Sequence, residues 1–268
     1  MHQIQTLSKH RPILFTILII ITCIGILYSS LLLNIEDEFY KDIVGSIVKN
    51  IITLALLFLL FKCNWFKGSL LTTSFKEWHP KWWLASLPML IIAGLNTVSI
   101  DWSLLSFDSI NILGWLYTNI STGLFEEILL RGMCFYVLYN AWKNKKNGLM
   151  YAAILQAVIF GLAHYVNLTK APFLEVSVQV TYSTLIGIGF AGVVAYSRSL
   201  WPAIILHSII NASGSINNFF QPNFISQDMA FINYVIIITV IAVICALPGY
   251  ILLRKKQSEL SIQNLGEA

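Results

Sequence analysis

Two adjacent carboxylates and an arginine lie deep inside an apolar stretch of the chain. Glu126 and Glu127 occur in the segment Gly123-Leu-Phe-Glu-Glu-Ile-Leu-Leu-Arg131. Residues four apart on a helix are neighbours, so Glu127 and Arg131 are predicted to form an ion pair that reduces the cost of burying both charges. Glu126 is rotated by about 100° from Glu127 and cannot share that face. Its carboxylate therefore stays free and suits a general base.

Two histidines are also embedded in apolar segments. His164 follows Phe160 by one helical turn, and His207 precedes Asn211 by one turn. Ionisable residues at membrane depth usually face the interior of a helix bundle and mark a functional site. His207 and Asn211 could give two hydrogen-bond donors to a developing oxyanion. His164 could hold a water for Glu126 or bind a metal ion.

Each of these features also has a structural interpretation. The Glu127–Arg131 pair could lock two helices together, and a lone histidine or asparagine could be a contact between helices. Phe160 is expected to pack under every interpretation. Structural roles account poorly for the whole set of two acids, one base, two histidines and one amide in three segments.

Composition identifies the elements that must position these groups as membrane helices. Hydrophobic residues make up 57% of the 268 positions, charged residues only 11%, and the mean hydropathy is +0.72. Apolar runs of about 20 residues match the thickness of a hydrocarbon core. We expect an all-α, multi-pass transmembrane bundle with eight spans, at residues 12–33, 43–61, 82–100, 113–141, 148–166, 173–196, 202–220 and 231–253. Lys49 interrupts the second span and is expected to snorkel from a helix end.

The connecting segments give the orientation and exclude some partners. Most of the 17 basic residues fall in loops on one side of the eight predicted spans, so both termini are predicted to be cytoplasmic. The net charge of +4 forms no basic stripe, so no nucleic-acid partner is expected. The four cysteines have no CxxC spacing and are expected to be packing residues. Gly187, Gly189 and Gly192 are expected to permit close approach of helices.

Three motifs in order resemble one known family. Glu126-Glu127-Ile-Leu-Leu-Arg131 resembles the EExxxR motif of the CPBP family, the Abi or type II CAAX-protease-like intramembrane proteases. Phe160-Gly-Leu-Ala-His164 resembles its FxxxH motif, and His207-Ser-Ile-Ile-Asn211, after Ser199-Leu-Trp-Pro202, resembles its HxxxN motif. The predicted organisation is a single integral membrane domain, residues 1–268, with a protease-like core at 115–215. The first three spans carry no matching motif.

The resemblance implies a role for each motif residue. Glu126 would activate a water together with His164, while His207 and Asn211 would stabilise the oxyanion. Glu127, Arg131 and Phe160 would support the site. Family members are often described as metalloproteases, and a metal-independent glutamate mechanism has also been argued for them. The cofactor is therefore either a divalent metal such as zinc or none. Because HExxH is absent, a metal would need ligands from separate helices, here Glu126, His164 and His207.

The predicted function is that of an intramembrane endopeptidase of the cytoplasmic membrane, acting on a membrane-associated peptide or protein. Bacterial family members are linked to peptide processing and bacteriocin immunity, and the Ile-, Asn- and Lys-rich composition looks bacterial. The main alternative is a non-catalytic membrane binding or immunity protein that retains the protease-like core. A proton-coupled transporter is a third reading, which the lack of an internal repeat disfavours.

One geometric conflict remains between the predicted spans and the motif grouping. His207 would lie about 8 Å from the start of its helix, and His164 about 24 Å along its own. Straight, vertical helices would keep these residues apart. The sequence therefore predicts either strong tilt or a fifth span that begins later and extends beyond His164.

Overall fold

The computed structural model describes residues 2–222, 224 and 229–266, and this part of the chain contains helices and no strand. The α-helices are α1 (His2–His10), α2 (Pro12–Ser29), α3 (Glu38–Lys62), α4 (Trp82–Asn96), α5 (Ser109–Glu127), α6 (Tyr136–Trp142), α7 (Gly148–Ala163), α8 (Phe173–Ser197), α9 (Trp201–Gly214), α10 (Ile216–Phe220), α11 (Phe231–Ile241) and α12 (Leu247–Gly266). π-Helical turns at Ile128–Phe135 and Ala242–Ala246 join α5 to α6 and α11 to α12. A 3-10 segment, His164–Thr169, follows α7.

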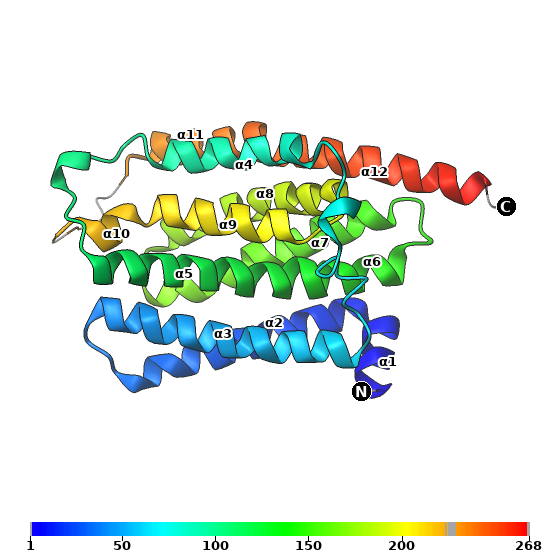
Figure 1. Ribbon diagram of the computed structural model, residues 1–268, viewed down its shortest axis with the longest axis horizontal. Coiled ribbons are helices and arrows are strands. Elements are labelled where there is room, and N and C mark those ends of the chain that lie inside the picture. Colours follow the sequence, from blue (N-terminus) through cyan, green and yellow to red (C-terminus); the bar gives the residue numbers. More distant parts are fainter. Residues whose placement is uncertain (1, 223, 225–228, 267–268) are drawn as a thin grey trace.

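The long helices run side by side along the length of one bundle (Figure 1). α5 packs between α3 and α9, and α9 in turn packs against α4. On the other side, α8 packs between α7 and α12. The motif helices are thus packed among other helices: α5 and α9 pack against each other, and both α7 and α9 contact α8.

Each of the eight predicted spans coincides with helix in the structure. Five helical segments are long and apolar enough to cross a membrane, namely Pro12–Ser29, Glu38–Lys62, Gly148–Thr169, Phe173–Ser197 and Phe231–Ser261, and α4 is a shorter apolar helix. The all-helical fold and several membrane-spanning helices are thus confirmed, and they identify a multi-pass membrane protein. The count of eight spans stays a prediction. The last helix continues to Gly266, beyond the predicted span end at residue 253.

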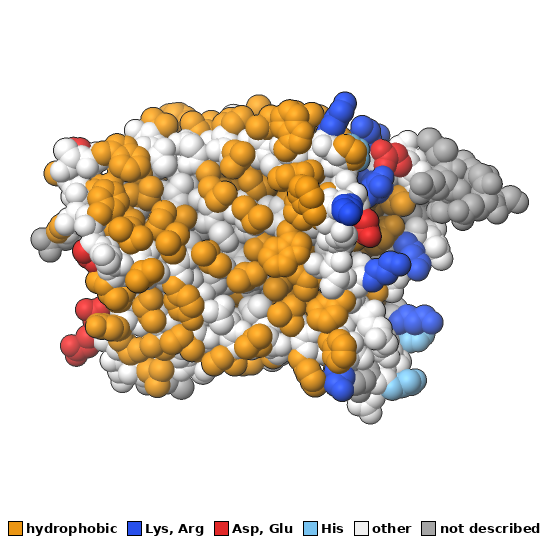
Figure 2. Space-filling view, in the orientation of Figure 1, with side chains coloured by type: hydrophobic (Ala, Val, Ile, Leu, Met, Phe, Trp, Pro, Cys, Tyr) orange, Lys and Arg blue, Asp and Glu red, His pale blue; other side chains and the backbone are white. Residues whose placement is uncertain are grey.

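Charged side chains are segregated to the two ends of the bundle. Figure 2 shows Lys and Arg gathered at the end where α1 begins and α12 ends, with a few acids among them. Exposed members of this group include Lys145 in the α6–α7 loop and Arg254 in α12. The opposite end is acidic, and Asp37 and Asp108 there cap the first turns of α3 and α5 through their side chains. Apolar side chains cover the band between the ends.

Glycines let α8 approach its neighbours closely, as the sequence predicted. A Cβ added at Gly192 would lie 2.5 Å from the Gly249 carbonyl oxygen and 2.6 Å from the Gly249 Cα. Gly189 meets Met89 and Cys245 in the same way, and Gly187 meets Ala157 of α7. α8 therefore packs backbone against backbone with α12, which fixes its position relative to the site helices.

Replacing Gly192 with alanine should lower the free energy of unfolding by about 1–3 kcal/mol, because the added methyl group meets rigid backbone. The matched control is Gly94→Ala in α4, where the same methyl group enters open space and should be neutral or slightly stabilising. Thermal unfolding of the detergent-purified protein measures both effects. Equal melting temperatures for the two variants would contradict the close contact between α8 and α12.

Candidate functional site

Close contact between α5 and α9 brings the first and third motifs together. Gly123 lies one turn before the two glutamates, and a Cβ there would collide with the Ser208 hydroxyl and lie 3.1 Å from the Ile204 carbonyl oxygen. A side chain at position 123 would therefore push α9 away from α5. The glycine instead lets His207, the neighbour of Ser208, reach the carboxylates of α5.

Glu127, Arg131 and His207 form a buried charged cluster. An Arg131 guanidinium N–H donates to Glu127 Oε1 at 2.6 Å, which confirms the predicted ion pair. His207 Nδ1 lies 2.7 Å from the same oxygen. Both side chains of the ion pair are wholly inaccessible to solvent. A carboxylate in such a position accepts two charge-assisted hydrogen bonds and is closed to a substrate.

Aromatic rings and a backbone carbonyl hold the Arg131 guanidinium on its remaining sides. Its central carbon lies 5.3 Å from the Phe160 ring centroid and 5.1 Å from that of Phe190. Its second terminal nitrogen lies 3.3 Å from the Gly187 carbonyl oxygen. Phe190 also stacks on His207, with centroids 5.1 Å apart and an interplanar angle of 19°. Phe190 carries no motif signal, and sequence reasoning missed it.

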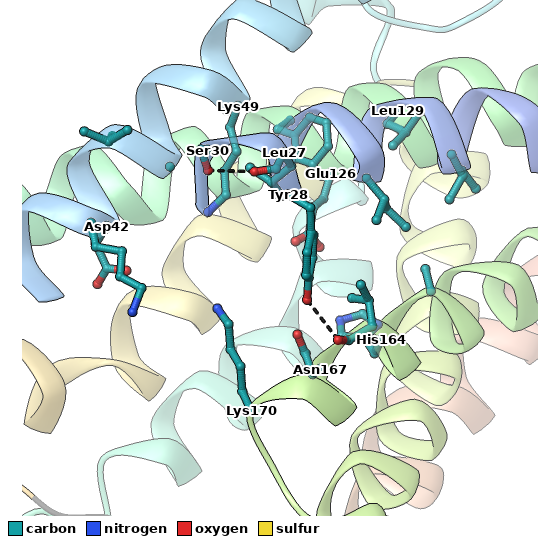
Figure 3. Close-up of a pocket in the computed structure, with 18 of the residues that line it drawn as sticks. Leu27, Tyr28, Ser30, Asp42, Lys49, Glu126, Leu129, His164, Asn167 and Lys170 are labelled. Carbon is teal, nitrogen blue, oxygen red and sulfur yellow. Dashed lines mark hydrogen bonds between the residues drawn. The ribbon is translucent and has the colours of Figure 1, made fainter. Parts of the chain in front are cut away.

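Glu126 differs from its neighbour because it faces a cavity. The cavity has a volume of about 610 Å³ and is lined by residues of α2, α3, α5, α7, α8 and the 3-10 segment after α7. Glu126 and His164 both line it, as Figure 3 shows. The Glu126 side chain is 23% exposed, and its Oε2 lies 3.5 Å from His207 Nε2. The structure thus separates the two carboxylates into a buried one and an accessible one.

A hydrogen bond fixes the tautomer of His164. Its Nδ1 lies 3.0 Å from the Phe160 carbonyl oxygen, which can only accept, so Nδ1 carries the proton. In the neutral ring Nε2 is then the acceptor. The Phe160 ring packs edge-on against the imidazole with centroids 4.8 Å apart. Phe160 therefore contacts both His164 and Arg131, which links the second motif to the first.

The position of the α8–α9 turn bears on the conflict over helix depth. α7 begins at Gly148, as expected, so a later start does not explain the grouping. Ser199 and Leu200 in the turn are completely buried, and the Leu200 N–H donates to the Leu70 carbonyl oxygen at 3.1 Å. The segment before α4 covers this turn, so α9 begins inside the bundle and His207 reaches the depth of Glu127.

Asn211 lies one turn after His207 on α9 and is half-buried. Its side chain makes no hydrogen bond to another described residue, and neither Asn211 nor His207 lines the cavity. Direct contacts connect Glu126, Glu127, Arg131 and His207. His164 lines the same cavity as Glu126, whereas Asn211 is related to the site only by its position one turn after His207.

Lys49 departs from the expected behaviour. α3 begins at Glu38, so Lys49 sits in mid-helix and does not snorkel to a helix end. Its Nζ donates to Thr122 Oγ1 at 2.8 Å, and its side chain lines the cavity (Figure 3). Within the described chain, no carboxylate lies within 4 Å of this cation. The sequence feature that could have identified this role is a lysine inside an apolar run. Because the predicted span began at residue 43, Lys49 was placed too close to a helix end.

The described part of the chain groups no set of side chains around a metal position. In the described ranges, no three His, Cys, Asp or Glu side chains are grouped closely enough to hold an ion. Glu126 Oε2 and His207 Nε2 lie 3.5 Å apart, but His164 does not join them in such a group. The three ligands considered from the sequence are therefore not assembled around one point.

Comparison with known families finds one match, which covers part of the chain. Residues 108–213 match the family model for Rce1-like type II CAAX prenyl endopeptidases. No curated protein and no solved structure matches the chain. The matched segment includes all three motifs and the side chains of the charged cluster. Residues 108–213 are therefore similar to the Rce1-like domain of type II CAAX prenyl endopeptidases, which is consistent with the resemblance found from the motifs.

Proposed function

We propose that this protein is an intramembrane endopeptidase of the cell membrane that hydrolyses a peptide bond of a membrane-associated peptide or protein. One observation carries the proposal: of two adjacent carboxylates, Glu127 is sealed in an ion pair while Glu126 faces a cavity shared with His164. A free carboxylate beside a histidine in a cavity is the arrangement that activates a water. The match to a protease family supports the same reaction class.

The proposed reaction needs only side chains of the described chain. Glu126 takes a proton from a cavity water, and the resulting hydroxide attacks the peptide carbonyl carbon. The carbonyl electron pair moves to oxygen, and as it returns the carbon–nitrogen bond breaks. The leaving nitrogen receives the proton that Glu126 holds. His164 Nε2, the acceptor nitrogen of its ring, accepts a hydrogen bond from the attacking water and orients it.

His207 and Asn211 are proposed as donors to the oxyanion. Glu127 accepts from Arg131 and is ionised, so His207 Nδ1 donates to it. His207 Nε2 lies 3.5 Å from Glu126 Oε2, so a proton carried by this nitrogen would be placed to donate to an oxyanion formed beside that carboxylate.

We further propose that all eight apolar segments cross the bilayer, with both termini in the cytoplasm. Five helical segments that could each span the membrane support this topology. The beginning of α1 and the end of α12 lie at the same end of the bundle, where the Lys and Arg side chains of the face shown in Figure 2 gather. Basic residues mark the cytoplasmic face of membrane proteins.

Glu126→Gln should abolish proteolysis while the protein still folds, because the amide keeps the shape and loses the base. Cells expressing wild type, Glu126→Gln or the exposed control Glu77→Gln at matched levels are compared by mass spectrometry of peptide termini. New termini are expected with wild type and Glu77→Gln only. Purified Glu126→Gln should then cleave a peptide spanning such a site at least about 100-fold more slowly. Termini that persist with Glu126→Gln would favour the non-catalytic binding protein.

Arg131→Met should destabilise the fold by about 3–5 kcal/mol, because it leaves Glu127 as an uncompensated buried charge. The control Arg254→Met removes an exposed guanidinium of α12 and should change stability little. Thermal unfolding in detergent measures both variants. A fully stable Arg131→Met protein would contradict the expected destabilisation, and loss of activity at unchanged stability would show that Arg131 positions Glu127 and His207.

A further inference from the structure

We propose that the substrate reaches Glu126 from the membrane face opposite the two termini, so that the enzyme acts on exported peptides or on extracytoplasmic segments of membrane proteins. This inference rests on the proposed function and adds the direction of access and the substrate class. It follows from where the cavity opens, where it is closed, and which end of the bundle carries the basic residues.

The mouth of the cavity is formed at the acidic end. Its outer lining includes Asn34 and Glu38 at the start of α3, together with Asp42 one turn further and Lys170 after α7. α3 begins, and the segment following α7 lies, at the end of the bundle away from α1 and the end of α12 (Figure 1). Charged side chains of both signs line this entrance, so water can enter it.

The cavity is deep enough to reach the glutamate. From Glu38 to Lys49, the cavity-lining part of α3 rises about 16 Å, at 1.5 Å per residue. Lys49 contacts Thr122, which lies one helical turn before Glu126. An extended peptide advances about 3.3 Å per residue, so about five residues would span the distance from mouth to glutamate. Apolar walls, including Leu27 and Phe125, would take apolar side chains near the scissile bond.

At the opposite end of the bundle, the hollows do not join this cavity. Beyond the cavity, the helix continues with Met133, Cys134 and Leu138, which have no exposed surface. Two smaller hollows at that end, one beside Lys9 and one beside Lys256, share no lining residue with the cavity. A cytosolic chain end would therefore meet hollows that share no wall with the cavity, whereas a peptide at the acidic face meets a polar entrance to it.

Membrane-impermeant maleimide labelling of single-cysteine variants tests the direction directly, without any requirement for proteolysis. Lys170→Cys lies at the mouth, and its matched control, Lys145→Cys, lies in the exposed α6–α7 loop at the basic end. The four native cysteines are buried and form a silent background. We expect labelling of Lys170→Cys in intact cells and of Lys145→Cys only after permeabilisation. The reverse pattern would overturn the proposed access.

Cleavage from each face of sealed vesicles separates this inference from the proposed function. A synthetic peptide spanning an identified cleavage site is added to right-side-out or inverted vesicles containing the full-length protein. Cleavage in right-side-out vesicles by wild type and not by Glu126→Gln supports the inference. Cleavage only in inverted vesicles overturns it and leaves the protease function standing. Absence of cleavage in both, and in detergent, would instead overturn the protease function.

Filling the cavity provides a test at the site itself. Gly45 lines the cavity, and a Cβ there meets nothing within 4 Å, so Gly45→Phe can occupy the path without a clash at its base. Gly25→Phe is the matched control, because Gly25 is exposed on α2, also has open space and lies outside the cavity lining. We expect Gly45→Phe to lower kcat/KM at least tenfold at an unchanged melting temperature. Full activity would overturn this path.

Discussion

The burial of one ion pair constrains the rest of this structure. The Glu127 and Arg131 side chains have no contact with solvent, and a pair of charges in an apolar interior is tolerated only when further hydrogen bonds compensate for lost water. Those partners come from other helices, namely His207 of α9 and the Gly187 carbonyl of α8. The ion pair therefore draws α8 and α9 onto α5, and the glycines that permit close contact follow from the same requirement.

This cluster also explains how two adjacent glutamates acquire different roles. A step of about 100° around the helix turns Glu126 away from Arg131 and toward the cavity. His207 contacts Glu127 through Nδ1 and lies 3.5 Å from Glu126 through Nε2, so one ring relates the buried carboxylate to the accessible one. His207 therefore connects the buried Glu127–Arg131 pair, which supports the site, to Glu126, the proposed general base.

Hydrolysis inside a membrane also requires water, and the cavity provides a route for it. Lys49 and the charged residues at the mouth line one wall, while apolar side chains line the others. The polar wall lies at the acidic end, and the hollows at the basic end share no lining residue with the cavity. The proposed catalysis and the proposed direction of access therefore both depend on this cavity, whose proposed mouth lies at the end of the bundle opposite the two termini.

The sequence by itself determined what depends on neighbours along the chain. The apolar runs predicted the helices, and the spacing of four residues predicted the Glu127–Arg131 pair, because both follow from helix geometry. The tertiary structure decided the contacts between distant segments, such as Phe190 on His207 and Lys49 in the cavity. The spacing of residues along the chain does not show how far inside the bundle α9 begins, or which face of α3 packs toward the interior. Those follow from burial of the α8–α9 turn and from packing of α3 against α5, which only the folded chain brings about.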